Sequence, residues 1–208
     1  MNPNGNHLRC AFLWVILVVL IGQRSTATTV VPPEFADLVN QSELIVRAKV
    51  LGQEAQYERA GSRRIVTMVE LEVVETIAGE APRPLVLRVP GGRVGEAEMV
   101  VEGAPVFTTG AEYVLFIQGN GRQFYPLVAM MYGLYTVERT PDGRVIITRS
   151  NHVPLHDTAE VSLPLTTGGA AQILRRLGRP AEAMTPETFI ERIRAAIKPN
   201  HPRLRDAR

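Results

Sequence analysis

Two histidines stand four positions apart in the sequence, at His152 and His156, and Asp157 follows the second. On a regular helix this spacing places both imidazoles on one face, where they can ligate zinc. Pro154 lies between them, however, and proline does not fit the interior of a regular helix. No glutamate completes the His-Glu-x-x-His motif of zinc hydrolases. We therefore expect solvated loop histidines, with no metal and no cofactor.

A glycine-rich segment, residues 90–95, is the second candidate for ligand chemistry. It contains Gly91, Gly92 and Arg93, but it lacks the Gly-Lys-Ser/Thr order of a phosphate-binding loop and the glycine order of a dinucleotide-binding loop. The sequence also lacks the Gly-x-Ser-x-Gly motif of serine hydrolases. We expect this segment to form an exposed turn between strands, and we expect no catalytic residue.

Aromatic residues gather in one predicted β-hairpin, residues 124–135, which holds Phe124, Tyr125, Tyr132 and Tyr135. Such a cluster either fills a core or lines a ligand-binding face. If the protein binds a partner, the stretch and the two loops described above are the predicted contact regions. The predicted interaction residues are Gly91, Gly92, Arg93, Tyr125, Tyr132, His152 and His156.

The charge and cysteine content exclude several classes of protein. Lys and Arg total 23 against 21 Asp and Glu, a net charge of +2, so we expect no nucleic-acid partner. The single cysteine, Cys10, excludes a disulfide scaffold and a cysteine-based zinc site.

The N-terminal residues have the organisation of a signal peptide. An unbroken apolar run covers residues 10–21 and follows a polar stretch that carries Arg9 and no acid. The run is shorter than the roughly 20 residues that a membrane-spanning helix needs, and it suits the apolar region of a secretory signal. Small residues at Ser25 and Ala27 predict cleavage after Ala27 and a secreted or periplasmic product without a stable membrane span. The alternative is an uncleaved signal that anchors the protein to the membrane.

Alternating apolar and polar residues predict six or seven short strands between residues 43 and 150. The clearest alternation covers residues 65–77, where Leu71 falls on the apolar face and Glu70 and Glu72 fall on the other. A small antiparallel OB-like barrel buries one face of such strands without leaving long exposed edges. The predicted fold is therefore mainly β.

Helical patterns flank the predicted strands. A short helix is expected at residues 33–39, a second at residues 170–177 before Gly178, and a third after the N-cap residue Thr185. The predicted organisation is a signal peptide at 1–27, a β-barrel domain at 28–150, a loop and helical appendage at 151–198, and a flexible tail at 199–208.

Two segments resemble netrin-like modules, the group that contains the tissue inhibitors of metalloproteinases. Residues 43–50, Glu-Leu-Ile-Val-Arg-Ala-Lys-Val, resemble the first barrel strand of these modules, and residues 110–116, Gly-Ala-Glu-Tyr-Val-Leu-Phe, are similar to a later strand. The pattern is also similar to uncharacterised exported bacterial proteins. The resemblance implies an OB-like barrel. It does not imply inhibition, because those inhibitors use an N-terminal cysteine and disulfides, which the processed chain would lack.

Together these patterns predict an exported, non-enzymatic binding or protein-interaction domain. Its partner would be a protein or small ligand outside the cytoplasm. Two alternatives stay open: an exported hydrolase or metal-dependent enzyme that uses His152 and His156, and a structural component of the cell envelope.

Overall fold

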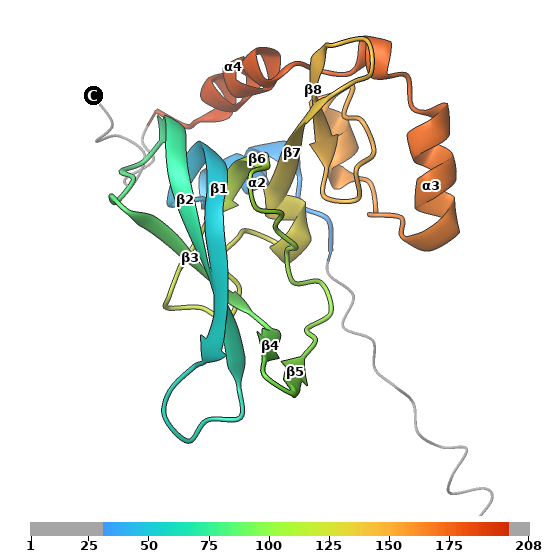
Figure 1. Ribbon diagram of the computed structural model, residues 1–208. Helices are drawn as coiled ribbons and strands as arrows, with labels where there is room; N and C mark the ends of the chain where they lie inside the picture. The colour runs from blue at the N-terminus through green and yellow to red at the C-terminus, as the bar shows by residue number, and fades with distance from the viewer. Residues whose placement is uncertain (1–30, 200–208) are drawn as a thin grey trace, which may run out of the picture. The chain divides into compact units, whose positions relative to one another are not determined.

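The computed structural model describes residues 31–199 (Figure 1). The predicted signal peptide at 1–27 and all but the first residue of the predicted tail lie outside the described residues. The helices and strands are, in chain order, α2 (Phe35–Gln41), β1 (Leu44–Tyr57), β2 (Ile65–Ala78), β3 (Leu85–Pro90), β4 (Gly92–Val94), β5 (Ala97–Met99), β6 (Glu112–Ile117), β7 (Leu134–Arg139), β8 (Val145–Arg149), α3 (Gly168–Leu177) and α4 (Pro186–Ala196). Short 3-10 turns occur at η1 (Met130–Gly133), η2 (Thr158–Ser162) and η3 (Pro180–Glu182).

A six-stranded antiparallel sheet forms the centre of the structure, with the strand order β3-β2-β1-β6-β7-β8. The long strands β1 and β2 pair from Ile45 with Ala78 to Tyr57 with Ile65, and they extend as a hairpin beyond the other strands (Figure 1). Strands β4 and β5 make a separate two-stranded sheet. The prediction of a mainly β, antiparallel fold is confirmed. Within residues 31–199, no pairing between β3 and β8 closes the large sheet into a barrel.

Both faces of the sheet are buried, and each face belongs to a different core. Side chains alternate along a strand, so Ile45 of β1 lies on one face and its neighbour Val46 on the other, and both are fully buried. We call one core the sheet–helix core; α2 and α4 cover it. It comprises Leu38, Val39, Ile45, Ile77, Ala78, Val114, Phe116, Val128, Tyr135, Ile147, Leu155, Val161, Met184, Phe189, Ile190 and Ile193.

The second core, which we call the inner-sheet core, lies on the other face of the same sheet. It comprises Leu44, Val46, Ala48, Val50, Val69, Leu71, Leu85, Leu87, Val89, Phe107, Tyr113, Leu115, Ile117, Leu127 and Leu134. Leu71 is 3% exposed, while Glu70 and Glu72 are exposed, so the predicted phase of strand β2 is confirmed.

The predicted C-terminal helices are confirmed. Helix α4 begins after Thr185, whose side chain accepts a hydrogen bond from the backbone N–H of Thr188 at 3.3 Å. Its buried residues Phe189, Ile190 and Ile193 belong to the sheet–helix core. This helix is therefore part of the main core of the protein.

The aromatic stretch does not form the predicted hairpin. Residues 124–131 run as irregular backbone into the turn η1, and only Leu127 makes an isolated bridge, to Ile117. Leu127 and Val128 are nevertheless buried, because the segment runs beside β6: the N–H of Gln118 donates to the carbonyl of Pro126 at 3.0 Å, and the N–H of Val128 donates to the carbonyl of Phe116 at 2.9 Å. Apolar residues that pair with a strand only through one isolated bridge look like strand residues in sequence, which accounts for the wrong prediction.

The glycine-rich segment is also less exposed than predicted. Gly91 is buried at φ +97°, and a Cβ there would lie 2.8 Å from the carbonyl oxygen of Met99. Gly92 has φ +134°, and a Cβ there would lie 2.5 Å from the hydroxyl of Thr67. These glycines are needed because the chain passes close to its neighbours as it enters the β4–β5 hairpin.

Candidate functional site

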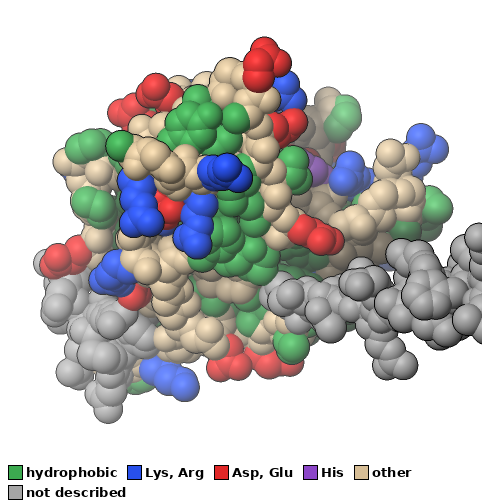
Figure 2. All heavy atoms as spheres, turned by 90° about the horizontal axis from the view of Figure 1, so that it is seen from below, with side chains coloured by type: hydrophobic (Ala, Val, Ile, Leu, Met, Phe, Trp, Pro, Cys, Tyr) green, Lys and Arg blue, Asp and Glu red, His purple; other side chains and the backbone are tan. Residues whose placement is uncertain are grey.

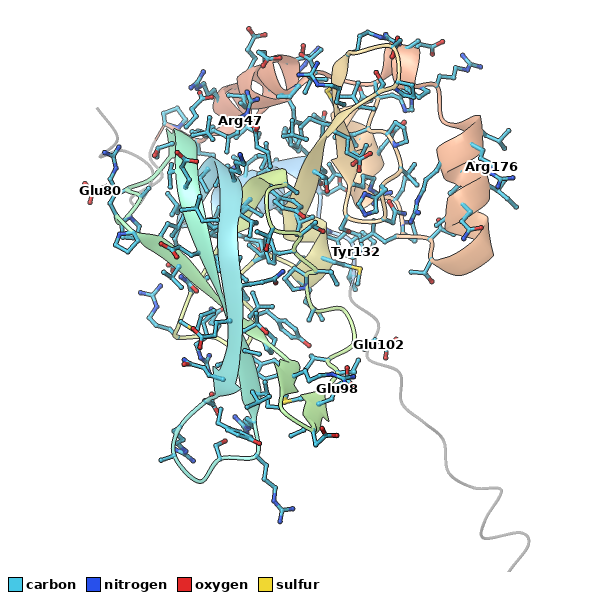
Figure 3. The ribbon with its side chains drawn as sticks, viewed as in Figure 1. Arg47, Glu80, Glu98, Glu102, Tyr132 and Arg176 are labelled. Carbon is cyan, nitrogen blue, oxygen red and sulfur yellow. The ribbon has the colours of Figure 1, made fainter. Side chains whose placement is uncertain are left out.

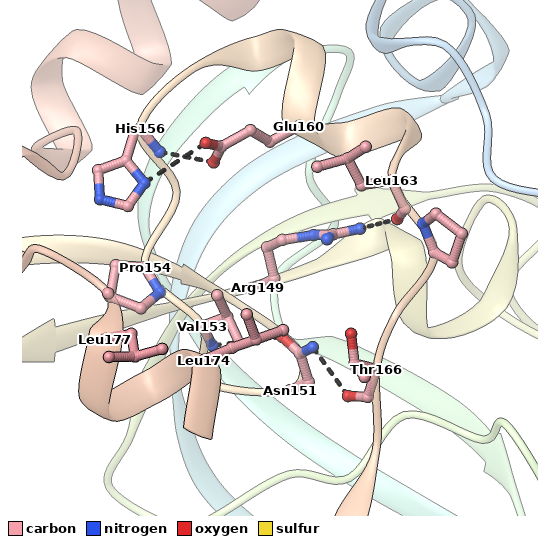
Figure 4. A pocket seen from close by; sticks show the side chains of 12 residues that line it. Arg149, Asn151, Val153, Pro154, His156, Glu160, Leu163, Thr166, Leu174 and Leu177 are labelled. Carbon is pink, nitrogen blue, oxygen red and sulfur yellow. Dashed lines mark hydrogen bonds and ion pairs between the residues drawn. The ribbon is translucent and has the colours of Figure 1, made fainter. Parts of the chain in front are cut away.

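A pocket of about 360 Å³ lies beside the end of β8 (Figure 4). Its walls come from the end of that strand, from residues 151–166, and from α3 with the glycine that follows it. It is lined by Arg149, Asn151, Val153, Pro154, His156, Glu160, Leu163, Pro164, Thr166, Leu174, Leu177 and Gly178. This volume is at the lower end of the range for small-molecule sites.

A tight chain reversal after β8 positions the floor of the pocket. The backbone N–H of His152 donates to the carbonyl of Arg149 at 2.7 Å, and His152 has a φ of +61°. The backbone N–H of Arg149 then donates to the carbonyl of Val153 at 2.9 Å. Asn151 fixes the reversal to the opposite wall, because its Nδ2 donates to the carbonyl of Thr166 at 3.0 Å.

Arg149 places a buried positive charge in this pocket. The residue is 6% exposed, and its Nη2 donates to the carbonyls of Val161, at 3.4 Å, and Leu163. Within residues 31–199, no carboxylate lies within 4.0 Å of the guanidinium, and neither Nε nor Nη1 has an acceptor. Burial lowers the pKa of Arg149, and the charge of Glu160 opposes this shift from a longer distance, but an arginine side chain remains protonated in proteins. The pocket therefore carries a fixed cation that forms no direct ion pair with a carboxylate of the described residues.

Tyr132 supports the wall that Arg149 contacts. Its hydroxyl accepts a hydrogen bond from the backbone N–H of Leu165 at 3.3 Å, and its ring is mostly buried. Figure 3 shows this side chain beside the segment that leads to α3. The predicted interaction residue Tyr132 is thus next to the pocket wall, although it does not line the pocket.

His156 and Glu160 form a polar pair on the pocket wall. The backbone N–H of His156 donates to Oε2 of Glu160 at 2.9 Å, and the ring Nδ1 lies 3.4 Å from Oε1. The other ring nitrogen lies 3.2 Å from the carbonyl oxygen of Arg179. Both ring nitrogens thus have polar neighbours in the protein.

The rest of the lining is apolar. Pro154, Leu163 and Pro164 contribute from the loop, and Leu174 and Leu177 contribute from α3. Leu174 is 41% exposed and Leu177 is 72% exposed, which leaves apolar surface of α3 open to solvent beside the cavity.

The predicted pair of histidines does not share one site. His152 lies in a neighbouring pocket of about 320 Å³, where Glu138 contacts its Nδ1. The hydroxyl of Thr148 donates to the same carboxylate oxygen at 2.9 Å. His156 instead pairs with Glu160. In the part of the chain that the structure describes, no group of three or more His, Cys, Asp or Glu residues is arranged to hold a metal ion.

The predicted loop residues Gly91 and Gly92 lie elsewhere, beside an apolar pocket of about 260 Å³ at the hairpin end of the molecule. Arg93 is exposed and pairs with Glu98 at 2.8 Å. Figure 2, which looks at this end, shows hydrophobic side chains bordered by Lys and Arg. Tyr125 stacks edge-on against Phe124, with ring centroids 4.9 Å apart, and lines neither of these two pockets.

The central residue of the site was not predicted, although the sequence carries a signal. In β8, Arg149 stands two positions after Ile147 and so shares a face with it, and Ile147 is fully buried. Arginine is rarely buried without a partner, so a charge at this phase of a strand marks an unusual environment. The other pocket residues, Asn151, Glu160 and Leu174, carry no comparable signal.

No protein family, curated protein or solved structure matches this chain. The helices between residues 31 and 199 are all too short or too polar to cross a bilayer.

Proposed function

We propose that this protein is an exported, non-enzymatic binding domain whose ligand site is the pocket beside β8. The observation that carries the proposal is Arg149, a buried cation that lines a largely apolar cavity and has no carboxylate within 4.0 Å among residues 31–199. A buried charge is costly unless it is paired, so a bound anion that forms a direct ion pair with it would be held strongly.

The chemistry of the pocket favours binding over catalysis. An arginine that stays protonated cannot act as a general base. The pair Glu138 and His152 in the neighbouring pocket resembles a histidine oriented by a carboxylate, which is the observation that keeps the hydrolase alternative open. Among the described residues, however, no hydroxyl or thiol is hydrogen-bonded to Nε2 of His152. Within residues 31–199, this pair therefore has no nucleophile hydrogen-bonded to it.

The proposed domain is built on an OB-like sheet. Three features support this topology: β1 pairs on both sides, its register with β2 shifts at three places, and strands of one sheet share the inner-sheet core. Such irregularities bend a strand and increase its twist, which lets one sheet curl around its own side chains.

Export is proposed from the apolar run at 10–21 and the small residues before position 28. The test is N-terminal sequencing of the product after expression of the full chain in a bacterial host. We expect the mature chain to begin at Thr28 and to leave the membrane fraction. A product that keeps Met1 in the membrane fraction would support the signal-anchor alternative.

Ligand binding is testable with a single thiol probe. In a Cys10→Ser background of the full chain, Leu177→Cys places one thiol at the pocket for an environment-sensitive fluorophore. Val100→Cys is the control, because Val100 is 84% exposed and belongs to the other end of the molecule, beside Gly91. Both labelled proteins are titrated with a panel of small carboxylates, inorganic phosphate, sugars and amines.

The proposal expects a saturable fluorescence change for at least one member of the panel at position 177 and none at position 100. If no member changes the signal at position 177, or if both positions respond alike, the pocket is not a ligand site and the proposal is wrong.

A further inference from the structure

We infer that the pocket beside β8 binds a monocarboxylate that carries a short apolar group. This inference rests on the proposed function, because it names the ligand class of the same site. It follows from the charge of Arg149, the limited number of donors around it, and the apolar walls.

Arg149 supplies the charge of the pocket and its free donors. Its Nη2 donates to the carbonyls of Val161 and Leu163, while Nε and Nη1 have no acceptor among the described residues. The Nε and Nη1 donors point along different edges of the guanidinium, so a carboxylate oxygen can accept from one of them in a charge-assisted hydrogen bond. A carboxylate is therefore an electrostatic match for these free donors.

The small number of free donors in the pocket favours a carboxylate over a phosphate. The only other cationic candidate that lines the pocket is His156, and its ring already lies beside Glu160 and the carbonyl of Arg179. Asn151 is engaged as well, since its Nδ2 donates to Thr166 and its Oδ1 accepts from Val153. A phosphate dianion is best held by more donors than this pocket offers, and the nearby carboxylate of Glu160 repels a dianion more strongly than a monoanion.

The apolar walls of the pocket indicate what the rest of the ligand is. Pro154, Leu163 and Leu174 provide apolar surface, and the volume of about 360 Å³ suits a small molecule. Burying apolar surface of both ligand and wall favours binding. A branched chain of a few carbons next to the carboxylate satisfies both the walls and the volume.

The probe is 4-methylpentanoate, and the matched control ligand is 4-methylpentanamide, which has the same shape without the charge. Binding is measured by isothermal titration calorimetry with the exported product of the full chain. We expect saturable binding of the acid and at least a tenfold weaker binding of the amide. Equal binding of the two compounds would overturn the inference.

Substitutions distinguish a ligand role of Arg149 from a purely structural one. Arg149→Met removes the charge and is expected to abolish binding, but it also removes bonds that hold the loop. Leu174→Glu therefore provides a second variant, since it places a negative charge at the 41% exposed pocket wall without touching the core. Ile173→Glu is its control, because Ile173 is the adjacent residue, is 58% exposed and does not line the pocket.

We expect Leu174→Glu to weaken binding of the acid at least tenfold and Ile173→Glu to leave it within twofold. Equal effects of the two variants would refute the placement of the ligand. If phosphate, a sugar or an amine binds at this pocket and the acid does not, this inference fails while the proposed function stands. If no member of the panel binds there, both fail.

Discussion

Replacement of Phe189 by alanine tests whether α4 is part of the main core. The side chain is fully buried, and its ring centroid lies 6.0 Å from that of Phe35, 6.2 Å from Phe116 and 4.8 Å from Tyr135. Truncation of a buried phenylalanine costs about 3–5 kcal/mol, and each lost aromatic contact is worth about 0.5–1.5 kcal/mol beyond burial. Because these rings belong to three other elements and cannot all move into the cavity, we expect a loss of about 4 kcal/mol in the free energy of unfolding.

The assay is urea unfolding followed by circular dichroism, because the only tryptophan, Trp14, lies in the predicted signal peptide. In thermal unfolding of the same protein, a shift of roughly 2–4 °C per kcal/mol for a chain of this size means that Tm should fall by about 8–16 °C. The control is Arg192→Ala on the exposed side of α4, which should change stability by less than about 0.5 kcal/mol. A loss below about 1 kcal/mol for Phe189→Ala would show that α4 is not docked on the sheet in solution.

Two further predictions concern the other core and the acid side of stability. Leu71→Ala in the inner-sheet core should cost about 2–5 kcal/mol in urea unfolding, whereas Glu72→Ala on the exposed face should be nearly neutral; equal losses would contradict the assigned strand phase. The pKa of Glu187 is lowered from 4.5, mainly by a hydrogen bond from its own backbone N–H at the start of α4. The side chain of Thr185 and the charge of Arg47 lower it further. Arg47 belongs to β1 and its Nη1 lies 3.3 Å from the Glu187 carboxylate, so the pair joins α4 to β1 (Figure 3). A carboxylate with a depressed pKa stabilises the fold above its ordinary pKa, and this contribution is lost as pH falls through the folded-state value. Between neutral pH and about pH 3, the free energy of unfolding should therefore fall more for the wild type than for Glu187→Gln. The difference should be less than about 1 kcal/mol, because the side chain is 69% exposed. Identical pH profiles of the two proteins would refute the assignment.

Strand phases and helix ends could be predicted from the sequence because they depend on neighbouring residues. The alternation around Leu71 correctly separates the buried face of β2 from the exposed face, since successive side chains of a strand point to opposite sides. Thr185 and Gly178 correctly predict where helices begin and end, because the groups that satisfy a helix terminus are local in sequence.

The covering segments could not be predicted in the same way. Leu127 and Val128 are as apolar as strand residues, but they pair with β6 only through an isolated bridge and its flanking hydrogen bonds. Gly91 looks like a residue of an exposed turn, yet it is buried where the carbonyl of Met99 approaches it. Both outcomes depend on contacts with other segments of the chain, and local sequence patterns do not record such contacts.

Local sequence patterns are enough to predict the antiparallel β framework and the helices that flank it, and a spacing of two residues puts Arg149 on the same face of β8 as Ile147. The surroundings of that arginine, in contrast, depend on how distant segments pack. The carbonyls of Val161 and Leu163 accept its hydrogen bonds, and Leu174 of α3 lines the same pocket. A charged residue in a strand is common when it is exposed to solvent and rare when other segments of the protein bury it. Which of the two occurs depends on long-range packing.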